Sequence, residues 1–290
     1  MSNVLPFGQA QAELPFGQAQ AVPWIKLDEV DSTNNFLRSG GRSSASRSLQ
    51  HLDTPSDHRM TLVTAEFQTA GRGAATNHWE SAKGENLLMS LRVMPSNLPV
   101  HRMFALSETT ALAIVDTLDA ILLSTPPKEG RGVSVKWPND IYYGDSKVAG
   151  VLIENDLQGA LVLRSIIGIG ININQRRFLS DAPNPRSLAD IIGHNIERRL
   201  VLEQFMDRFT YYFGQIENGR TDALDTLHER YIKHLYRRGE EHLYSDKDGA
   251  FRATLVDVES TGHLILRDTK GNQRRYAFKE VKYETPILNF

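Results

Sequence analysis

The chain contains no cysteine, no long apolar run and almost no net charge, and each absence excludes a class of protein. Without cysteine there are no disulfides, zinc–thiolate sites or thiol nucleophiles. No apolar run approaches membrane-spanning length, and the N-terminus lacks the charged-then-apolar layout of a signal peptide. With 33 basic and 35 acidic residues no strongly basic face is implied, which argues against nucleic acid as the main partner. We therefore expect a cytoplasmic globular protein.

The length of 290 residues is enough for one sizeable core and a smaller second domain. The first residues carry a direct repeat, LPFGQAQA, at Leu5–Ala12 and again at Leu14–Ala21. Pro, Gly and Gln cannot build a core, so residues 1–22 are predicted to be a flexible leader, with a docking tail as the alternative. Residues 39–59, rich in Ser and Arg, are predicted to be a mobile insertion.

Hydrophobic periodicity predicts an α/β domain over residues 23–236. Core-packing helices are expected at 99–123, 202–217 and 223–236, with a short one at 187–192, and strands at 24–30, 62–67, 86–93, 133–137, 141–143, 147–154 and 160–174. From residue 237 to 290 short strands recur, with turns at Asp248-Gly249, Thr261-Gly262 and Lys270-Gly271. This spacing predicts a small β-barrel.

The strand at 62–67 runs into Gly71-Arg72-Gly73, and Trp79 closes the loop. Glycines permit φ > 0 and let a backbone approach a ligand, leaving N–H groups that can face an anion. Arg72 offers a planar fork for a carboxylate or phosphate. A Gly-Arg-Gly tripeptide by itself is usually only a polar turn, so the interpretation depends on the motifs further along the chain.

Polar groups also end three later strands. Lys136-Trp137-Pro138-Asn139-Asp140 stops one strand, Lys147 opens the KVAGVLIE hairpin, and IGIGININ carries Gly168 and Gly170, which leave a sheet face open to a ligand. The plainer interpretation is a strand end, a turn and a bulge. If the clusters converge, they suit activation of a carboxylate by a nucleotide, because cations neutralise the phosphate while the carboxylate is held in line.

Taken in order, G-R-G with a following W, K-W-P-N-D, K-x-A-G-x-L-I-E and G-I-G-I-N-x-N resemble the motifs of biotin protein ligases, over roughly residues 24–174. The resemblance implies a catalytic fold like that of class II aminoacyl-tRNA synthetases and an SH3-like C-terminal domain. It also implies ATP with Mg²⁺ as co-substrate, biotin as substrate and biotinyl-5′-AMP as intermediate. The implied partner is a biotin carboxyl carrier domain of a biotin-dependent carboxylase, met by a monomer or homodimer.

The resemblance also implies roles for individual residues. Catalysis falls to Lys147, Arg72 and Asp140, and the nucleotide end to Trp79, Asn139, Asp140 and Asn172. The biotin end falls to Ser32, Thr33, Asn34, Gln68, Gly71, Arg72, Gly73, Ala74, Lys147 and Gly150. By themselves Ser32 and Thr33 are merely the start of a helix. No metal site is assigned, since phosphates are expected to hold most of the Mg²⁺.

The sequence departs from the family after the Gly-Arg-Gly, where Ala74, Ala75 and Thr76 replace a longer Arg or Gln. Loss of one charge-assisted hydrogen bond would cost about 1.5–3 kcal/mol, which corresponds to roughly 10–100-fold weaker retention of the adenylate. The hypothesis is a leaky intermediate that acylates bystander lysines. The alternative is that backbone amides make the contact.

Two rival functions stay open. A lipoate–protein ligase shares the architecture, although KWPND paired with GRG favours biotin. A biotin-responsive transcriptional repressor needs an N-terminal DNA-binding domain, for which the repeat leader leaves no room. We expect the ligase activity alone.

Overall fold

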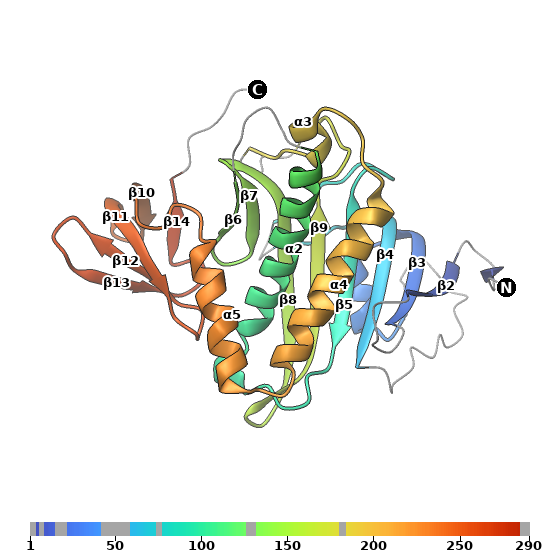
Figure 1. The fold of residues 1–290 in the computed structure, drawn as a ribbon, viewed down its shortest axis with the longest axis horizontal. Coiled ribbons are helices and arrows are strands. Elements are labelled where there is room, and N and C mark those ends of the chain that lie inside the picture. Colours follow the sequence, from blue (N-terminus) through green and yellow to red (C-terminus); the bar gives the residue numbers. More distant parts are fainter. Residues whose placement is uncertain are drawn as a thin grey trace.

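The computed structural model describes residues 4–5, 9–14, 22–41, 59–73, 77–125, 132–179 and 184–284 (Figure 1). Most of the predicted insertion, and the departure at Ala74–Thr76, lie outside the described residues. The described chain forms two separate sheets, one of nine strands and one of five.

The larger sheet has the order β1-β2-β3-β4-β5-β9-β8-β7-β6. Only β3 and β4 run parallel, and every other neighbouring pair is antiparallel. The strands predicted from alternation are all present. Their bounds are β1 Val4–Leu5, β2 Gln9–Leu14, β3 Val22–Val30, β4 Met60–Gln68, β5 Leu87–Val93, β6 Val133–Lys136, β7 Asp140–Tyr143, β8 Ser146–Gln158 and β9 Leu161–Ile171.

Part of the leader, expected to be flexible, instead extends this sheet. β2 pairs with β3 in antiparallel register, with Ala12 opposite Trp24 and Leu14 opposite Val22. The backbone N–H and C=O groups of an edge strand offer a template to any extended segment, whatever its side chains. Composition therefore predicted the lack of a core in the leader but not this pairing.

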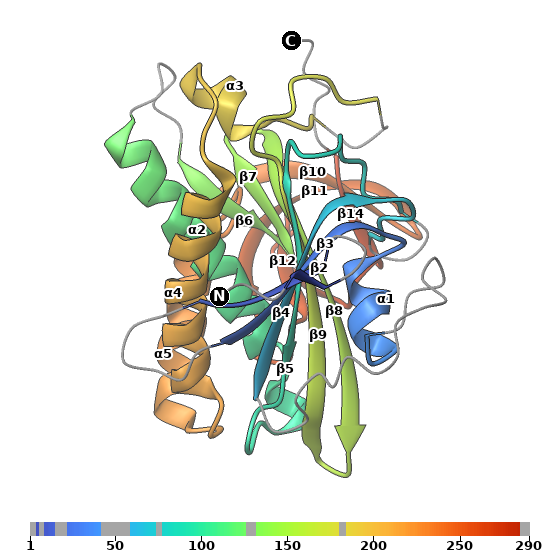
Figure 2. The same ribbon diagram turned by 90° about the vertical axis from the view of Figure 1, so that its right-hand side faces the viewer.

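Helices lie on both faces of the larger sheet. α2 (Ala105–Ser124), α4 (Arg198–Ile216) and α5 (Thr221–Lys233) cover one face, and α1 (Thr33–Arg38) lies on the other, as Figure 2 shows. A short helix, α3 (Leu188–Ile192), follows β9. The main core lies under α2 and α4, whereas a smaller core packs Phe36 and Leu37 of α1 against β3 and β4. No helix in the described ranges is long and apolar enough to cross a membrane.

The helix predicted from Pro99 begins as a 3₁₀ turn, Val100–Arg102, and becomes α-helical at Ala105. Its predicted inner face is confirmed, because Ala111, Val115 and Leu118 are buried. The aromatic run Tyr211-Tyr212-Phe213 of the helix expected at 202–217 suggests three core residues, but Tyr211 is 64% exposed, while Tyr212 next to it is buried. Adjacent helical positions point about 100° apart, so one aromatic of the run necessarily leaves the core.

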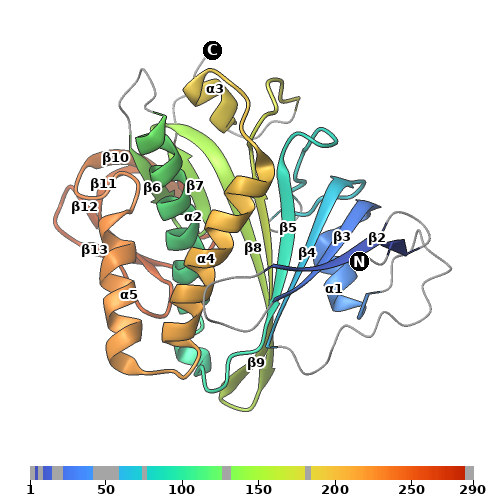
Figure 3. The same cartoon turned by 45° about the vertical axis from the view of Figure 1, so that its right-hand side comes forward.

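The C-terminal sheet has the order β13-β12-β11-β10-β14 and is antiparallel throughout. Gly249, Gly262 and Gly271 have positive φ, as the predicted turns require. Figure 3 shows this sheet beside β6 and β7, at the opposite end of the molecule from β2. The strands are β10 Glu241–Asp246, β11 Gly249–Val258, β12 Leu264–Asp268, β13 Gln273–Tyr276 and β14 Val281–Tyr283.

Helices α2 and α5 are joined by a buried polar pair. His228 Nδ1 lies 2.6 Å from Glu108 Oε1, and Glu108 is 2% exposed. Burial raises the pKa of Glu108, and the hydrogen bond that His228 donates to Glu108 raises the pKa of His228. When folding raises the pKa of a group, the folded protein is stabilised at pH values below the pKa that the group has in the unfolded chain. This stabilisation is lost as the pH rises through the pKa that the group has in the folded protein, for a carboxyl group and a histidine alike.

We therefore expect the free energy of unfolding to fall as the pH rises above about 6.5, the ordinary pKa of a histidine, because both groups lose stability in the same direction. Glu108→Gln should flatten this dependence and cost about 1.5–3 kcal/mol near pH 6, the contribution of a hydrogen bond to a charged group. Urea unfolding at several pH values measures both effects. A wild-type midpoint that rises over this range would contradict the account.

Candidate functional site

One cavity of about 850 Å³ opens where the predicted polar clusters meet. Their convergence is confirmed. The strand-end residues reach the cavity from α1, from the loop after β4, from the β6–β7 turn and from β8 and β9. The predicted site residues in its lining are Ser32, Thr33, Asn34, Gln68, Arg72, Gly73, Trp79, Asn139, Asp140, Lys147, Gly150 and Asn172. Gly71 is not in the lining, and Ala74 lies outside the described residues.

Three glycines of β8 and β9 form the base of this cavity; we call Gly150, Gly168 and Gly170 the glycine surface. Gly150 pairs with Gly170, and Leu152 pairs with Gly168, so the three share one face. A Cβ on Gly170 would lie 2.3 Å from the Trp79 indole, and one on Gly168 would lie 2.4 Å from Asn34 Oδ1. The glycines thus make room for two cavity side chains as well as for a ligand.

The Gly-Arg-Gly loop differs from its prediction. Neither Gly71 nor Gly73 has positive φ, and Gly73 N–H donates to Asn77 O at 2.8 Å instead of facing the cavity. Trp79 N–H donates in turn to Gly71 O at 2.9 Å. A Cβ at Gly71 would lie 2.5 Å from Trp79 O. Here glycine is required by the close approach of two backbone segments, which a residue pattern alone cannot distinguish from a φ requirement.

At the α1 end, a buried hydrogen-bond cluster surrounds Thr33 and Asn34. The Thr33 backbone N–H and hydroxyl both donate to Gln68 Oε1, at 2.8 and 3.1 Å. Ser90 Oγ lies 2.7 Å from Thr33 Oγ1 and 2.5 Å from Asn34 Oδ1. Ser32 precedes the helix, but its side chain makes no capping bond. These side chains are therefore held by one another and not by the helix terminus.

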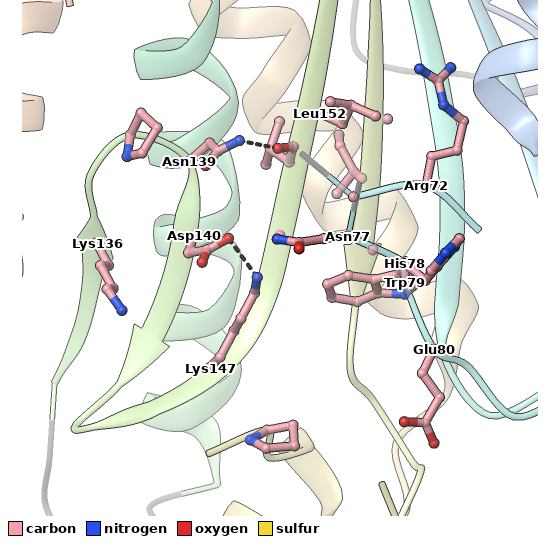
Figure 4. Close-up of a pocket in the computed structure, with 18 of the residues that line it drawn as sticks. Arg72, Asn77, His78, Trp79, Glu80, Lys136, Asn139, Asp140, Lys147 and Leu152 are labelled. Atoms are coloured by element: carbon pink, nitrogen blue, oxygen red, sulfur yellow. Dashed lines mark hydrogen bonds and ion pairs between the residues drawn. The ribbon is translucent and has the colours of Figure 1, made fainter. Parts of the chain in front are cut away.

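At the opposite end, Lys147 and Asp140 form an ion pair. Lys147 Nζ lies 2.7 Å from Asp140 Oδ1 and 5.6 Å from the centre of the Trp79 ring. Figure 4 shows these two side chains pointing toward each other, with Arg72 extending away at the far side of the cavity. The ion pair with Asp140 therefore fixes the position of the Lys147 ammonium group at this end of the cavity.

Three buried polar atoms of cavity-lining residues have no hydrogen-bond partner among the described residues. They are Trp79 Nε1, Asn172 Oδ1 and Tyr283 Oη. Asn139, by contrast, donates to Val151 O. An unpaired buried donor or acceptor costs about 1–3 kcal/mol. These three atoms therefore have hydrogen-bonding capacity that no described residue uses.

Several residues of the site were missed by the sequence reasoning. Lys136, at the end of β6, lines the cavity, donates to Tyr142 Oη at 3.0 Å and lies 5.3 Å from the Tyr283 ring. Burial lowers its pKa to about 8, against the opposing effect of Asp140. The C-terminal sheet supplies further wall residues, namely Phe278, Lys279, Val281, Lys282 and Tyr283. Lys136 stood in the KWPND motif, whereas nothing in the sequence placed the C-terminal residues here.

Within the described part of the chain, no three His, Cys, Asp or Glu side chains group as a metal site. A divalent ion here would need oxygen ligands from a bound phosphate, as Mg²⁺ commonly uses.

Comparison with known proteins agrees with this fold. Residues 40–172 match the Biotin/lipoate A/B protein ligase family. The bifunctional ligase/repressor BirA of Escherichia coli is 30% identical over 258 residues, which span 85% of this chain and 72% of that protein. BirA of Bacillus spizizenii is 28% identical over 240 residues, 81% of this chain and 70% of that protein. A biotin protein ligase from Aquifex aeolicus in complex with biotin and ATP superposes with a TM-score of 0.67, covering 91% of this chain and 99% of that one at 24% identity.

The predicted fold class is confirmed: a catalytic domain like that of class II aminoacyl-tRNA synthetases, with a small SH3-like sheet after it. The chain belongs to the biotin/lipoate A/B protein ligase family, among the biotin protein ligases.

The glycine surface gives a direct test of the geometry. Gly170→Ala places a methyl group inside the Trp79 ring, so we expect a displaced indole and a loss of about 1–3 kcal/mol from overpacking. Tryptophan fluorescence and thermal unfolding measure the two effects. Gly214→Ala is the control, because its Cβ meets nothing within 4 Å and it lies in α4, where alanine favours the helix. Unchanged fluorescence in Gly170→Ala would contradict the placement of Trp79.

Proposed function

We propose that this protein is a biotin–[biotin carboxyl-carrier protein] ligase that joins biotin to ATP and then transfers the biotinyl group to a lysine of a carrier domain. The observation that carries the proposal is a single cavity with a buried amide and hydroxyl cluster at one end and the Lys147–Asp140 pair at the other. Its volume lies within the range of small-molecule sites, which suits a biotinyl nucleotide. The names of the relatives, which include biotin–[acetyl-CoA-carboxylase] ligases, support the same activity.

In the first half-reaction, a biotin carboxylate oxygen attacks the α-phosphorus of Mg-ATP. A new O–P bond forms as the bond to the β-phosphate oxygen breaks, and pyrophosphate leaves with the Mg²⁺. The reacting groups carry like charges, so catalysis requires fixed cations and correct placement. Lys147 supplies a cation at the reacting centre, while Asp140 holds its ammonium in place until the ligand takes over that contact.

The two ends of the cavity suit the two halves of the intermediate. Ser32, Thr33, Asn34 and Gln68 offer donors and acceptors for the ureido end of biotin, with the backbone of the Gly71–Gly73 segment beside them. Gly150 leaves space between the ends. At the nucleotide end, the unpaired Trp79 Nε1 and Asn172 Oδ1 await polar partners, next to Asn139 and Lys136. Arg72 stands at the biotin side, where its guanidinium offers donors to biotin.

In the second half-reaction, the amine of the carrier lysine attacks the acyl carbon. A C–N bond forms, the C–O bond to AMP breaks, and the amine gives up a proton to solvent water. Lys147 then stabilises the negative charge on the departing AMP. The carrier lysine must enter the cavity from solvent to reach the acyl carbon. The proposal names its carrier only by class, as a biotin carboxyl carrier domain.

Replacement of Lys147 tests the assignment. Lys147→Gln should slow carrier labelling by roughly 10²–10³-fold, the usual consequence of removing one preorganised charge contact in a reacting centre. The purified protein is mixed with biotin, Mg-ATP and a carrier domain, and the acceptor mass is followed. Lys247→Gln, an exposed lysine of the C-terminal sheet, is the control and should leave the rate unchanged.

The same assay separates the rival functions. An added mass of lipoate in place of biotin, when both acids compete, would make the protein a lipoate–protein ligase. Binding to duplex DNA at low salt would add a repressor function. Absence of any acceptor labelling by the wild-type protein would overturn the ligase proposal.

The departure at Ala74–Thr76 supports a second proposal about the same reaction: the adenylate escapes more readily than in relatives with a long polar side chain there. One lost charge-assisted hydrogen bond corresponds to roughly 10–100-fold weaker retention. Free biotinyl-AMP is an activated acyl group, and it would acylate lysines of proteins that never dock.

Restoring the side chain tests this second proposal. Ala74→Arg should reduce biotin labelling of an unrelated lysine-rich protein by roughly tenfold or more, while labelling of the carrier domain stays fast. Mass spectrometry of both acceptors in one mixture provides the comparison. Undetectable bystander labelling by the wild-type protein would show that the short side chain at residue 74 does not loosen the intermediate.

A further inference from the structure

Glu154 lies at the end of the cavity that α1 covers, but it is not among the cavity-lining residues of the described chain. Along β8, side chains alternate between faces, so Glu154 follows Gly150 and Leu152 on the cavity side. Its side chain is 15% exposed. A carboxylate this buried is stable only if it is paired and hydrogen-bonded.

Its partners come from three separate segments. Arg72 binds it through both terminal nitrogens, at 2.9 and 3.2 Å. Arg38, at the end of α1, lies 2.8 Å away. Asn34 Nδ2 donates to it at 3.0 Å. One carboxylate therefore joins β8 to α1 and to the Gly-Arg-Gly loop.

The pairing with Arg72 is directional. Glu154 takes the Nη1–Nη2 edge of the guanidinium, and Nη1 also donates to Asn35 Oδ1 at 3.0 Å. No acceptor from the described residues faces Nε of Arg72, so the other edge of the fork retains donors for a ligand in a cavity that Arg72 lines. A planar guanidinium held along one edge cannot rotate, which fixes the direction of the remaining donors.

Glu154 also sets the orientation of the Asn34 amide. The amide nitrogen points to Glu154 and the oxygen to Ser90 Oγ. Gly168 lies beneath this amide, with no room for a Cβ. The alternative orientation, with the oxygen toward Glu154, would place two acceptors against each other. The carboxylate thus determines what Asn34 presents to the cavity.

We propose that Glu154 is a positioning residue for the biotin end of the cavity: it holds Arg72 and Asn34 in the orientations that bind the ligand, without touching the ligand itself. The proposal rests on the proposed function for the identity of the ligand. It concerns one end of the cavity, since none of the contacts of Glu154 reaches Lys147, Asp140 or Trp79.

The test compares Glu154→Gln with two variants that remove similar ion pairs nearby. A glutamine has the same shape, but its NH₂ group faces donors and only one oxygen accepts. Asp156→Asn breaks the Asp156–Arg164 pair two residues further along β8, away from the cavity. Arg38→Gln removes a partner of Glu154 but leaves Arg72 and Asn34 in contact with it. Glu154→Asp keeps the charge and withdraws the carboxylate, which provides a second variant if the glutamine form does not fold.

We expect Glu154→Gln and Glu154→Asp to raise the KM for biotin at least tenfold and the KM for ATP less than twofold. In the ligand-free proteins, amide hydrogen exchange should accelerate in residues 33–38 and 71–73. Asp156→Asn and Arg38→Gln should change neither constant by more than about twofold. A merely structural glutamate would instead shift both KM values and thermal stability together.

Two results would overturn the proposal. One is an unchanged KM for biotin in the folded Glu154 variants, and the other is an equal rise for biotin and ATP. Hydrogen exchange needs no substrate, so its outcome separates this proposal from the ligase assignment. Unaltered hydrogen exchange in the Glu154 variants would contradict the positioning role even if the ligase reaction is confirmed. An inactive wild-type protein, together with faster exchange in the Glu154 variants, would contradict the ligase assignment alone.

Discussion

The site depends on one strand register, the pairing of β8 with β9 that sets Gly150 opposite Gly170 and Leu152 opposite Gly168. Because side chains alternate along a strand, this register brings three residues without side chains to one face. Trp79 and Asn34 lie on that face at distances no Cβ would permit. A slip of one residue in either strand would place the side chain of Val151 or Ile169 where a glycine now stands and fill the base of the cavity. The hydrophobic pattern of both strands excludes this slip, since Val151 and Ile169 belong to the core under α2.

The same strand carries the charges at both ends of the cavity. Lys147 is near the start of β8 and Glu154 lies beyond its middle, seven residues later, or about 23 Å along an extended strand. Asp140, the first residue of β7, pairs with Gly150 of β8. It therefore lies beside the glycine surface and within reach of Lys147. The strand β8 thus sets the separation between the Lys147 end and the α1 end of the cavity. A ligand that contacts both ends must have a matching length.

The sequence predicted the strands and the motif residues well, because both depend on neighbouring positions in the chain. It did not predict contacts between residues that are distant in sequence. Alternation identified the strands, and the order of motifs identified the residues that line the cavity. The role of Gly71 was misjudged because glycine serves both φ > 0 and close approach, and only the neighbouring Trp79 backbone decides between them. Glu154 looked like the end of a hairpin, since its partners Arg72 and Arg38 are distant in sequence and meet it only through the order of the sheet. Tyr283 and Phe278 were unplaceable for the same reason.

The two ends of the cavity differ in what builds them. The α1 end is made within the larger sheet and α1, by the hydrogen-bond cluster around Thr33 and Asn34. The Lys147 end also requires the C-terminal sheet: Trp137 Nε1 donates to Gly262 O at 2.9 Å, and Lys136 lies against Tyr283. The Asn139–Asp140 turn follows Trp137 and Pro138, so its position depends on the packing of the two sheets. The α1 end is therefore formed by the larger sheet and α1, and the Lys147 end is completed only where the second sheet packs against β6.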